Sequence, residues 1–217
     1  MSRPNPSSAG RSTARGAAAG AGAAARGAAR SELRIIGGQW RRSRIDVLDL
    51  PGLRPTPDRV RETLFNWLGQ DLTGWRVLDA FAGSGALGLE AASRGAAAVL
   101  LVESDRRARG ALEATCQRLK AEAVRVVGAD AMALLARAPD GPLYDLILLD
   151  PPYATRLQAP ALQACRRWLA PQGLVYLEDD HEWTAEELVA QGWQRWRCGQ
   201  AGAVHFHLLR RLDDPTD

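Results

Sequence analysis

Short apolar runs recur along this chain from residue 77 onwards, and helical stretches separate them. Five runs share this pattern: Val77 to Phe81, Val99 to Val102, Val124 to Val127, Leu146 to Leu149 and Leu174 to Leu177. Continuous apolar runs of this length are typical of strands buried on both faces, and regular alternation with helices indicates crossover connections. The pattern therefore predicts an α/β fold with a mostly parallel sheet and helices on both faces.

The carboxyl end departs from this rhythm. Two strand-like segments, Trp193 to Trp196 and Val204 to Leu209, are joined only by the short turn Gly199 to Ala203. A parallel crossover needs a dozen or more residues, so we expect these segments to form an antiparallel hairpin at the sheet edge. Together with the five runs, they bring the expected sheet to seven strands.

The first third of the chain has a different composition. Residues 1 to 30 are mostly Ala, Gly, Ser and Arg without any aromatic or acidic residue, so we expect a disordered basic tail. Residues 31 to 74 form a small extension, with a short strand at Leu33 to Ile36 and a helix that begins at Pro57 and is capped by Thr56. The α/β domain then spans residues 75 to 212, and residues 213 to 217 form a carboxyl-terminal tail.

Positive charge is concentrated at the front of the chain. Residues 1 to 76 hold 13 arginines and 6 acidic residues, whereas residues 77 to 217 hold 15 basic and 19 acidic residues. Such clustering is typical of a surface that faces nucleic-acid phosphates, and a basic tail without a partner is the alternative.

No apolar run approaches the roughly 18 residues of a membrane span, and Cys116, Cys165 and Cys198 show neither disulfide nor zinc spacing. The absence of disulfide spacing favours a reducing cytoplasm. His205 and His207 lack a third metal ligand, so we expect no metal.

A glycine-rich loop follows the first apolar run, in the sequence Asp79-Ala80-Phe81-Ala82-Gly83-Ser84-Gly85-Ala86-Leu87-Gly88. Glu103 comes 20 residues after Gly83, at the end of the second run. Loop glycines let the backbone approach a nucleotide, and an acid at this distance binds ribose hydroxyls, a pattern shared by several adenosine-containing ligands. Asp79 favours a cationic ligand, because its carboxylate would oppose a pyrophosphate.

A second motif, Asp150-Pro151-Pro152-Tyr153, directly follows the fourth apolar run and so lies at the carboxyl edge of the sheet, where ligands bind. The prolines have no N–H and leave their carbonyls as acceptors in a fixed direction. An ionised Asp150 and the Pro151 carbonyl could each accept one N–H from a base amine, which localises the nitrogen lone pair, while Tyr153 stacks on the base. A proline-rich structural turn is the alternative.

Both motifs resemble those of methyltransferases. Asp79-x-Phe81-x-Gly83-x-Gly85 resembles motif I of the Rossmann-like class I enzymes, and Asp150 to Tyr153 resembles the [DNS]-PP-[YFW] motif of enzymes that methylate adenine N6, cytosine N4 or guanine N2. This resemblance implies that S-adenosylmethionine is the methyl donor. It also implies that the loop residues Asp79, Phe81, Gly83 and Gly85 wrap its methionine part, Glu103 holds the ribose and Asp130 contacts the adenine. A helix cap is the other interpretation of Asp130.

The segment before the α/β domain narrows the resemblance to one family of methyltransferases. Arg34-Ile35-Ile36-Gly37-Gly38-x-Trp40-Arg41, followed by Leu53-Arg54-Pro55-Thr56-x-x-Arg59-Val60-Arg61-Glu62, is similar to the bacterial RsmD family, over about Glu32 to Arg211. The resemblance implies methylation of one guanine N2 in 16S rRNA on the small ribosomal subunit, and we expect a monomer. It makes phosphate-binding candidates of Arg34, Arg41, Arg42 and Arg54, and the helix after Pro57 a cover for the cofactor pocket.

Other hypotheses remain open at this point. An adenine-N6 methyltransferase acting on DNA or RNA would carry the same amine-binding motif. From other classes, an NAD-dependent oxidoreductase would use the glycine loop alone, and a non-catalytic RNA-binding module would use the arginines alone. The acidic cluster Glu178 to Asp180 follows the fifth run, and we interpret it as capping the next helix rather than lining the pocket.

Overall fold

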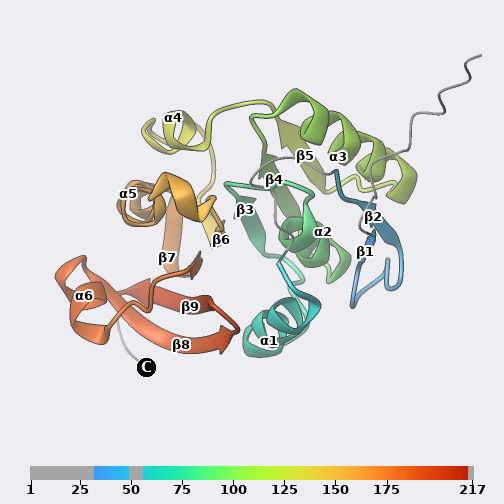
Figure 1. Ribbon diagram of the computed structural model, residues 1–217. Helices are drawn as coiled ribbons and strands as arrows, with labels where there is room; N and C mark the ends of the chain where they lie inside the picture. Colours follow the sequence, from blue (N-terminus) through green and yellow to red (C-terminus); the bar gives the residue numbers. More distant parts are fainter. Residues whose placement is uncertain (1–31, 49–55, 215–217) are drawn as a thin grey trace, which may run out of the picture.

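The computed structural model describes residues 32–48 and 56–214, so Arg54 and the expected disordered tail lie outside the described residues. The main element is a seven-stranded sheet with the order β5-β4-β3-β6-β7-β9-β8 (Figure 1). Its strands are β3 (Arg76–Asp79), β4 (Ala98–Val102), β5 (Val124–Val127), β6 (Tyr144–Leu149), β7 (Leu169–Asp179), β8 (Trp193–Ala201) and β9 (Val204–Arg211). Strands β3 to β7 pair in parallel, while β9 pairs antiparallel with both β7 and β8. The predicted parallel sheet and antiparallel edge hairpin are confirmed.

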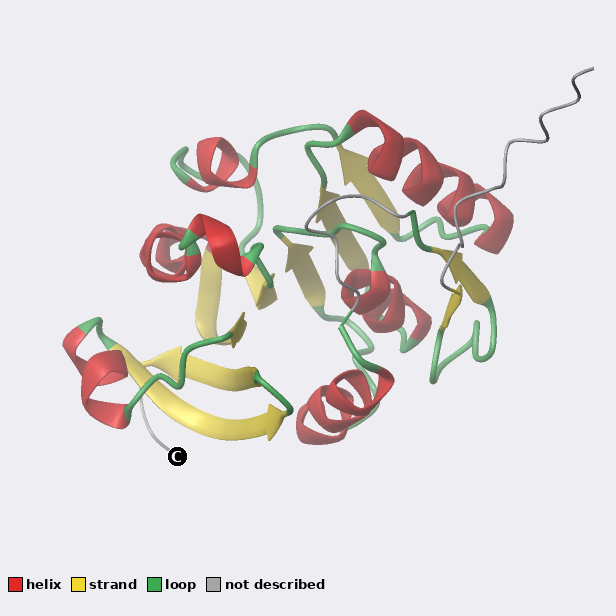
Figure 2. Cartoon of the chain, viewed as in Figure 1, coloured by secondary structure: helices red, strands yellow, loops and turns green. Residues whose placement is uncertain are grey.

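Helices cover both faces of this sheet (Figure 2). Successive strand residues face opposite sides, as Val77 and Leu78 show by joining different buried clusters. The Val77 side is covered by α1 (Asp58–Leu68), α2 (Ala86–Ser93) and α3 (Arg106–Leu119). The Leu78 side is covered by α4 (Ala131–Leu135), α5 (Gln158–Ala164), the 3-10 turn η2 (Cys165–Trp168) and α6 (Ala185–Ala190). No helix among the described residues is long and apolar enough to cross a membrane.

The amino-terminal extension adds a separate two-stranded sheet, β1 (Glu32–Arg34) and β2 (Arg44–Asp46), beside α3. Its apolar side chains, including Ile35 and Ile45, are buried in the cluster that also contains α1 and α2. The extension is tied to the domain by Glu90 of α2, whose carboxylate accepts the backbone N–H groups of Ile36 at 2.8 Å and Gly37 at 2.7 Å. It therefore packs as part of the same core.

A buried ion pair between Arg61 of α1 and Glu90 of α2 holds α1 against this core. The Arg61 side chain is fully buried and lies 2.6 Å from Asp58, 3.5 Å from Glu90 and 3.0 Å from the Arg34 carbonyl oxygen. Arg94 pairs with the same Glu90 carboxylate at 2.7 Å. Arg61 thus pairs with Asp58 within α1 and with Glu90 of α2, and Glu90 shares its charge with two guanidinium groups.

Three local expectations were wrong. Ala80 and Phe81 lie beyond β3 because the chain leaves the sheet there to form the glycine loop. The turn between β8 and β9 is only Gly202 and Ala203, with Gly202 at φ +63°, so both strands are longer than their apolar runs. Thr56 does not cap α1: the helix begins after Pro57 without a side-chain cap, and the Thr56 hydroxyl donates to Asp150 instead.

Candidate active site

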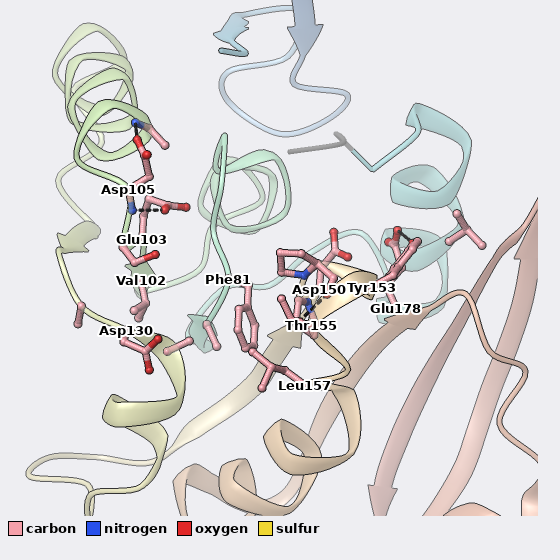
Figure 3. Close-up of a pocket in the computed structure, with 18 of the residues that line it drawn as sticks. Phe81, Val102, Glu103, Asp105, Asp130, Asp150, Tyr153, Thr155, Leu157 and Glu178 are labelled. Carbon is pink, nitrogen blue, oxygen red and sulfur yellow. Dashed lines mark hydrogen bonds between the residues drawn. The ribbon is translucent and has the colours of Figure 1, made fainter. Parts of the chain in front are cut away.

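A cavity of about 430 Å³ opens at the carboxyl ends of β3, β4, β5, β6 and β7 (Figure 3). Glu103 and Asp130 lie at one end, and Asp150 and Tyr153 lie at the other, with Phe81 between them. The parallel strands explain this grouping, because each residue immediately follows or closely follows a strand that ends at the same edge of the sheet. A cavity of this size suits a nucleoside-sized ligand.

The cavity is acidic. Among its described lining residues there is no Lys, Arg or His, whereas its carboxylates are Glu103, Asp105, Asp130, Asp150 and Glu178. Grouped carboxylates repel an anion and attract a cation, more strongly where water is partly excluded. The cavity therefore fits the ammonium and sulfonium of S-adenosylmethionine, and it opposes the pyrophosphate of a dinucleotide.

The glycine loop is held by two of the three acids predicted to bind cofactor, Glu103 and Asp79. Glu103 accepts the N–H of Gly83 at 2.9 Å and that of Asp105 at 2.6 Å. Asp79 is buried and accepts the N–H of Gly88 at 3.0 Å. Desolvation by burial raises the pKa of Asp79 to about 7, and the charge of Glu103 adds to the rise. Asp79 thus lies beneath the loop, bound to its backbone.

Two glycines shape this loop rather than the cavity wall. Gly85 has φ +79° and precedes α2, and a Cβ there would lie 2.4 Å from the Cδ1 of Leu112. Gly83 has φ +53°. Neither these glycines nor Asp79 is among the cavity-lining residues, while Phe81, Glu103 and Asp130 are. Asp130 also caps α4 by accepting the N–H of Ala133 at 2.7 Å, so the helix-cap interpretation holds as well.

Asp150 and the following residues form the other end of the cavity. The Asp150 carboxylate accepts the Thr56 hydroxyl at 3.0 Å. Burial first, and the charge of Glu178 second, raise the pKa of Asp150 well above its usual range. We expected an ionised carboxylate with an ordinary pKa. The structure differs, because this environment disfavours the ionised form of Asp150. Pro151 and Pro152 line the cavity, and Tyr153 begins the 3-10 turn η1 (Tyr153–Thr155).

Glu178 lines the same end, contrary to its interpretation as a helix cap. Its carboxylate is buried and accepts the hydroxyls of Tyr153 at 2.9 Å and Tyr176 at 2.7 Å. The cap of α6 is instead Thr184. Strand register explains the placement: Leu149 of β6 pairs with Leu177 of β7, so the residues that follow them, Asp150 and Glu178, emerge side by side.

The remaining candidates lie elsewhere. Arg34, Arg41 and Arg42 are exposed on the β1–β2 extension, none of them lining the cavity. His207 is buried on β9, where burial lowers its pKa to about 4. The described residues contain no group of three or more side chains that could hold a metal.

The fold and the acidic cavity, with a glycine loop at one end and Asp150 to Tyr153 at the other, define a class I methyltransferase. Comparison with known proteins narrows this class, because the family described as "Conserved hypothetical protein 95" matches residues 33–210. The chain belongs to this family, the RsmD family.

Individual relatives agree over most of their length. Ribosomal RNA small subunit methyltransferase D from Escherichia coli (strain K12) is 43% identical over 182 residues, which covers 83% of this chain and 90% of the relative. The protein of the same name from Haemophilus influenzae is 38% identical over 183 residues, or 82% and 94% of the two chains. The solved structure of the Escherichia coli protein yhhF has a TM-score of 0.70 at 38% identity and covers 83% of this chain and 98% of that one.

Proposed function

We propose that this protein transfers a methyl group from S-adenosylmethionine to the exocyclic N2 amine of one guanine in the 16S rRNA of the small ribosomal subunit. The observation that carries the chemistry is the cavity that Asp150 to Tyr153 help to line, in which every charged lining residue is acidic and attracts a cation. The substrate follows from the relatives, which are named as methyltransferases of small-subunit ribosomal RNA.

The cofactor end is proposed from the contacts of its acids. Glu103 uses both carboxylate oxygens on backbone N–H groups, yet each oxygen has a second lone pair that can accept a ribose hydroxyl. Asp130 lines the same end and would face the adenine, while Phe81 separates the two ends of the cavity. The loop held by Asp79 would enclose the methionine part. When bound there, S-adenosylmethionine supplies an electrophilic methyl group on a positively charged sulfur.

The amine end is proposed to prepare the nucleophile. The lone pair of an exocyclic base amine is delocalised into the ring, so the amine must be held with its lone pair directed at the methyl carbon. Oxygen atoms of Asp150 and of the Pro151 carbonyl accept the two N–H groups, and the Tyr153 ring stacks on the base. With the methyl donor bound, the nitrogen so held would bond to the methyl carbon as the carbon–sulfur bond breaks, and the electron pair would stay on the sulfur of S-adenosylhomocysteine. The surplus N–H proton then passes to Asp150 or to water.

The arginines of the extension are proposed to bind rRNA. Arg34, Arg41 and Arg42 are exposed on the β1–β2 extension, where they can contact phosphates without entering the acidic cavity. The target guanine must leave its stack to reach the cavity, which costs a few kcal/mol in a duplex and less in a loop. A single-stranded segment of rRNA therefore suits the site best.

A transfer assay tests the proposal. The protein is incubated with methyl-labelled S-adenosylmethionine and either small ribosomal subunits that lack the modification or duplex DNA containing adenine. We expect label in 16S rRNA alone, and digestion followed by mass spectrometry should find N2-methylguanine. Label in adenine would support an adenine-N6 methyltransferase instead. Failure to label either substrate, with tight NAD binding, would overturn the methyltransferase proposal.

A further inference from the structure

Thr56 links the amino-terminal extension to the proposed catalytic carboxylate. It is only 4% exposed, and its hydroxyl donates to Oδ2 of Asp150 at 3.0 Å, across 94 residues of sequence. Threonine ahead of a helix ordinarily accepts a backbone N–H as a cap. Here α1 has no side-chain cap, and the hydroxyl serves the carboxylate.

The position of this contact determines what it can do. A carboxylate turns about its last bond, so an unheld Asp150 would present its oxygens in many directions. A donor on Oδ2 fixes the plane of the group and leaves Oδ1 as the oxygen available to the target amine. Asp150 and Pro57, the residue after Thr56, both line the cavity, so the contact lies next to it.

We propose that Thr56 is a positioning residue for methyl transfer, orienting Asp150 so that Oδ1 receives an N–H of the target amine. This inference rests on the proposed function of the Asp150 site. It assigns to the extension a part in the reaction itself, besides the binding of rRNA.

The electrostatic surroundings of Asp150 give the contact a second effect. The groups that face Asp150 are Glu178 and Tyr176 on β7, Asp79 at the end of β3, and Thr56. Both carboxylates raise the pKa of Asp150, whereas the Thr56 hydrogen bond lowers it. Without the hydroxyl, the ionised acceptor would form only at higher pH.

The test compares two substitutions at Thr56 with a matched control. Thr56→Val keeps the shape and removes the hydroxyl, and Thr56→Ser restores it. Thr63→Val is the control, because Thr63 lies in the helix that follows, α1, and its hydroxyl donates only to the Arg59 carbonyl in an exposed contact. For each protein, kcat and KM for small ribosomal subunits are measured from pH 5 to 9, with melting temperature and calorimetric affinity for S-adenosylhomocysteine.

We expect Thr56→Val to lower kcat roughly tenfold to a hundredfold, the effect of one lost hydrogen bond to a charged group. Activity is lost as pH falls through the pKa of Asp150, and this pKa should be higher in the Thr56→Val enzyme. The acidic limb of its pH profile should therefore move to higher pH. Affinity for S-adenosylhomocysteine should stay within a few-fold of wild type, and Thr56→Ser should recover most of the activity. If the valine variant does not fold, Thr56→Ala gives the same readouts.

Two results would overturn the inference. One is a Thr56→Val enzyme with the kcat and pH profile of Thr63→Val. The other is a loss that appears only in KM or melting temperature and is not recovered by serine. Absence of transfer by the wild-type protein would instead overturn the proposed function, and this inference with it.

Discussion

Asp150 occupies an environment that resists negative charge. It shares its end of the cavity with Glu178, and burial and this second carboxylate both raise its pKa. Two neighbouring carboxylates titrate as a pair, so a positive charge brought near them favours the ionised forms. A sulfonium bound beside Phe81 would provide that charge. The site would then be most ready to hold an amine when the methyl donor is already present.

Removal of the Asp150 carboxylate tests its role. We expect Asp150→Ala to reduce methyl transfer below about one hundredth of wild type, because the acceptor that orients the amine is lost. Calorimetry should find the affinity for S-adenosylhomocysteine changed only a few-fold, since Asp150 lies at the opposite end from Glu103. The exposed Asp140→Ala variant should behave as wild type in both assays. Unchanged turnover of Asp150→Ala would refute the assigned role.

The buried carboxyl of Asp79 predicts a pH-dependent stability. Its pKa is about 7 in the folded protein and has a reference value of 3.8, so the folded state binds a proton more tightly than the unfolded state. Protonation of Asp79 therefore stabilises the folded protein at low pH, and this stabilisation is lost as pH rises through 7. The free energy of unfolding of wild type minus that of Asp79→Asn should therefore fall by about 2 to 3 kcal/mol between pH 5 and 8. Urea denaturation measures it, and a difference that is flat over this range would contradict the prediction.

For single residues, the sequence predicts which side chains lie at the cavity better than it predicts which side chains contact one another. Glu103 and the Asp150 motif were predicted from their places after strands, because parallel strands deliver their carboxyl ends to one edge. Phe81 and Asp130 were implied by the resemblance to class I methyltransferases. The partner of Thr56 could not be found in the same way. A threonine followed by proline and aspartate is a good local helix start, and the competing contact with Asp150 depends on tertiary packing.

Whole elements were predicted well where apolar runs mark them. Strand β5 begins and ends where its run does. Strands β6 and β7 extend beyond their runs, because Tyr144 pairs with Leu169 at their start, and Glu178 and Asp179 at the end of β7 pair with β9. The edge hairpin was predicted, but β8 runs to Ala201 through the exposed residues Arg197 and Cys198. Hydrophobicity marks the buried part of an edge strand and misses the part that faces solvent.

The start of α2 depends on a glycine, which gives a prediction at the scale of the element. Gly85→Ala should destabilise the protein by about 1 to 3 kcal/mol, because it places a Cβ at φ +79° and 2.4 Å from Leu112. Gly110→Ala is the control: Gly110 lies in α3, and a Cβ added there would meet nothing within 4 Å, so alanine should stabilise by about 0.5 to 1 kcal/mol.

Chemical denaturation of both variants measures the difference. Equal stability of the two would show that the loop does not require glycine at position 85. We also expect Gly85→Ala to weaken binding of S-adenosylhomocysteine, because the same loop carries Phe81 into the cavity. Gly110→Ala should leave that affinity unchanged.

Over the whole molecule, charge is divided between two surfaces. The charged residues that line the cavity are all carboxylates. Arg34, Arg41 and Arg42 are instead exposed on the extension, which packs beside α3 at one end of the sheet (Figure 1). A polyanion would be attracted to the extension and repelled from the cavity lining. The acidic site would therefore admit a single neutral base, and the flanking phosphates would stay outside.

This separation predicts how rRNA binding depends on salt. Each phosphate contact releases condensed counterions. On single strands, the logarithm of the binding constant therefore falls by about 0.7 per contact for each tenfold increase in salt. The triple variant Arg34→Ala, Arg41→Ala and Arg42→Ala should bind small ribosomal subunits more weakly and reduce the slope of log Kd against log salt by roughly two. The control replaces three exposed arginines outside the extension, Arg137, Arg167 and Arg197, with alanine and removes the same charge. Equal slopes for the two triple variants would show that net charge, and not the extension, governs binding. The affinity for S-adenosylhomocysteine should be unaltered in both variants, because none of these arginines lines the cavity.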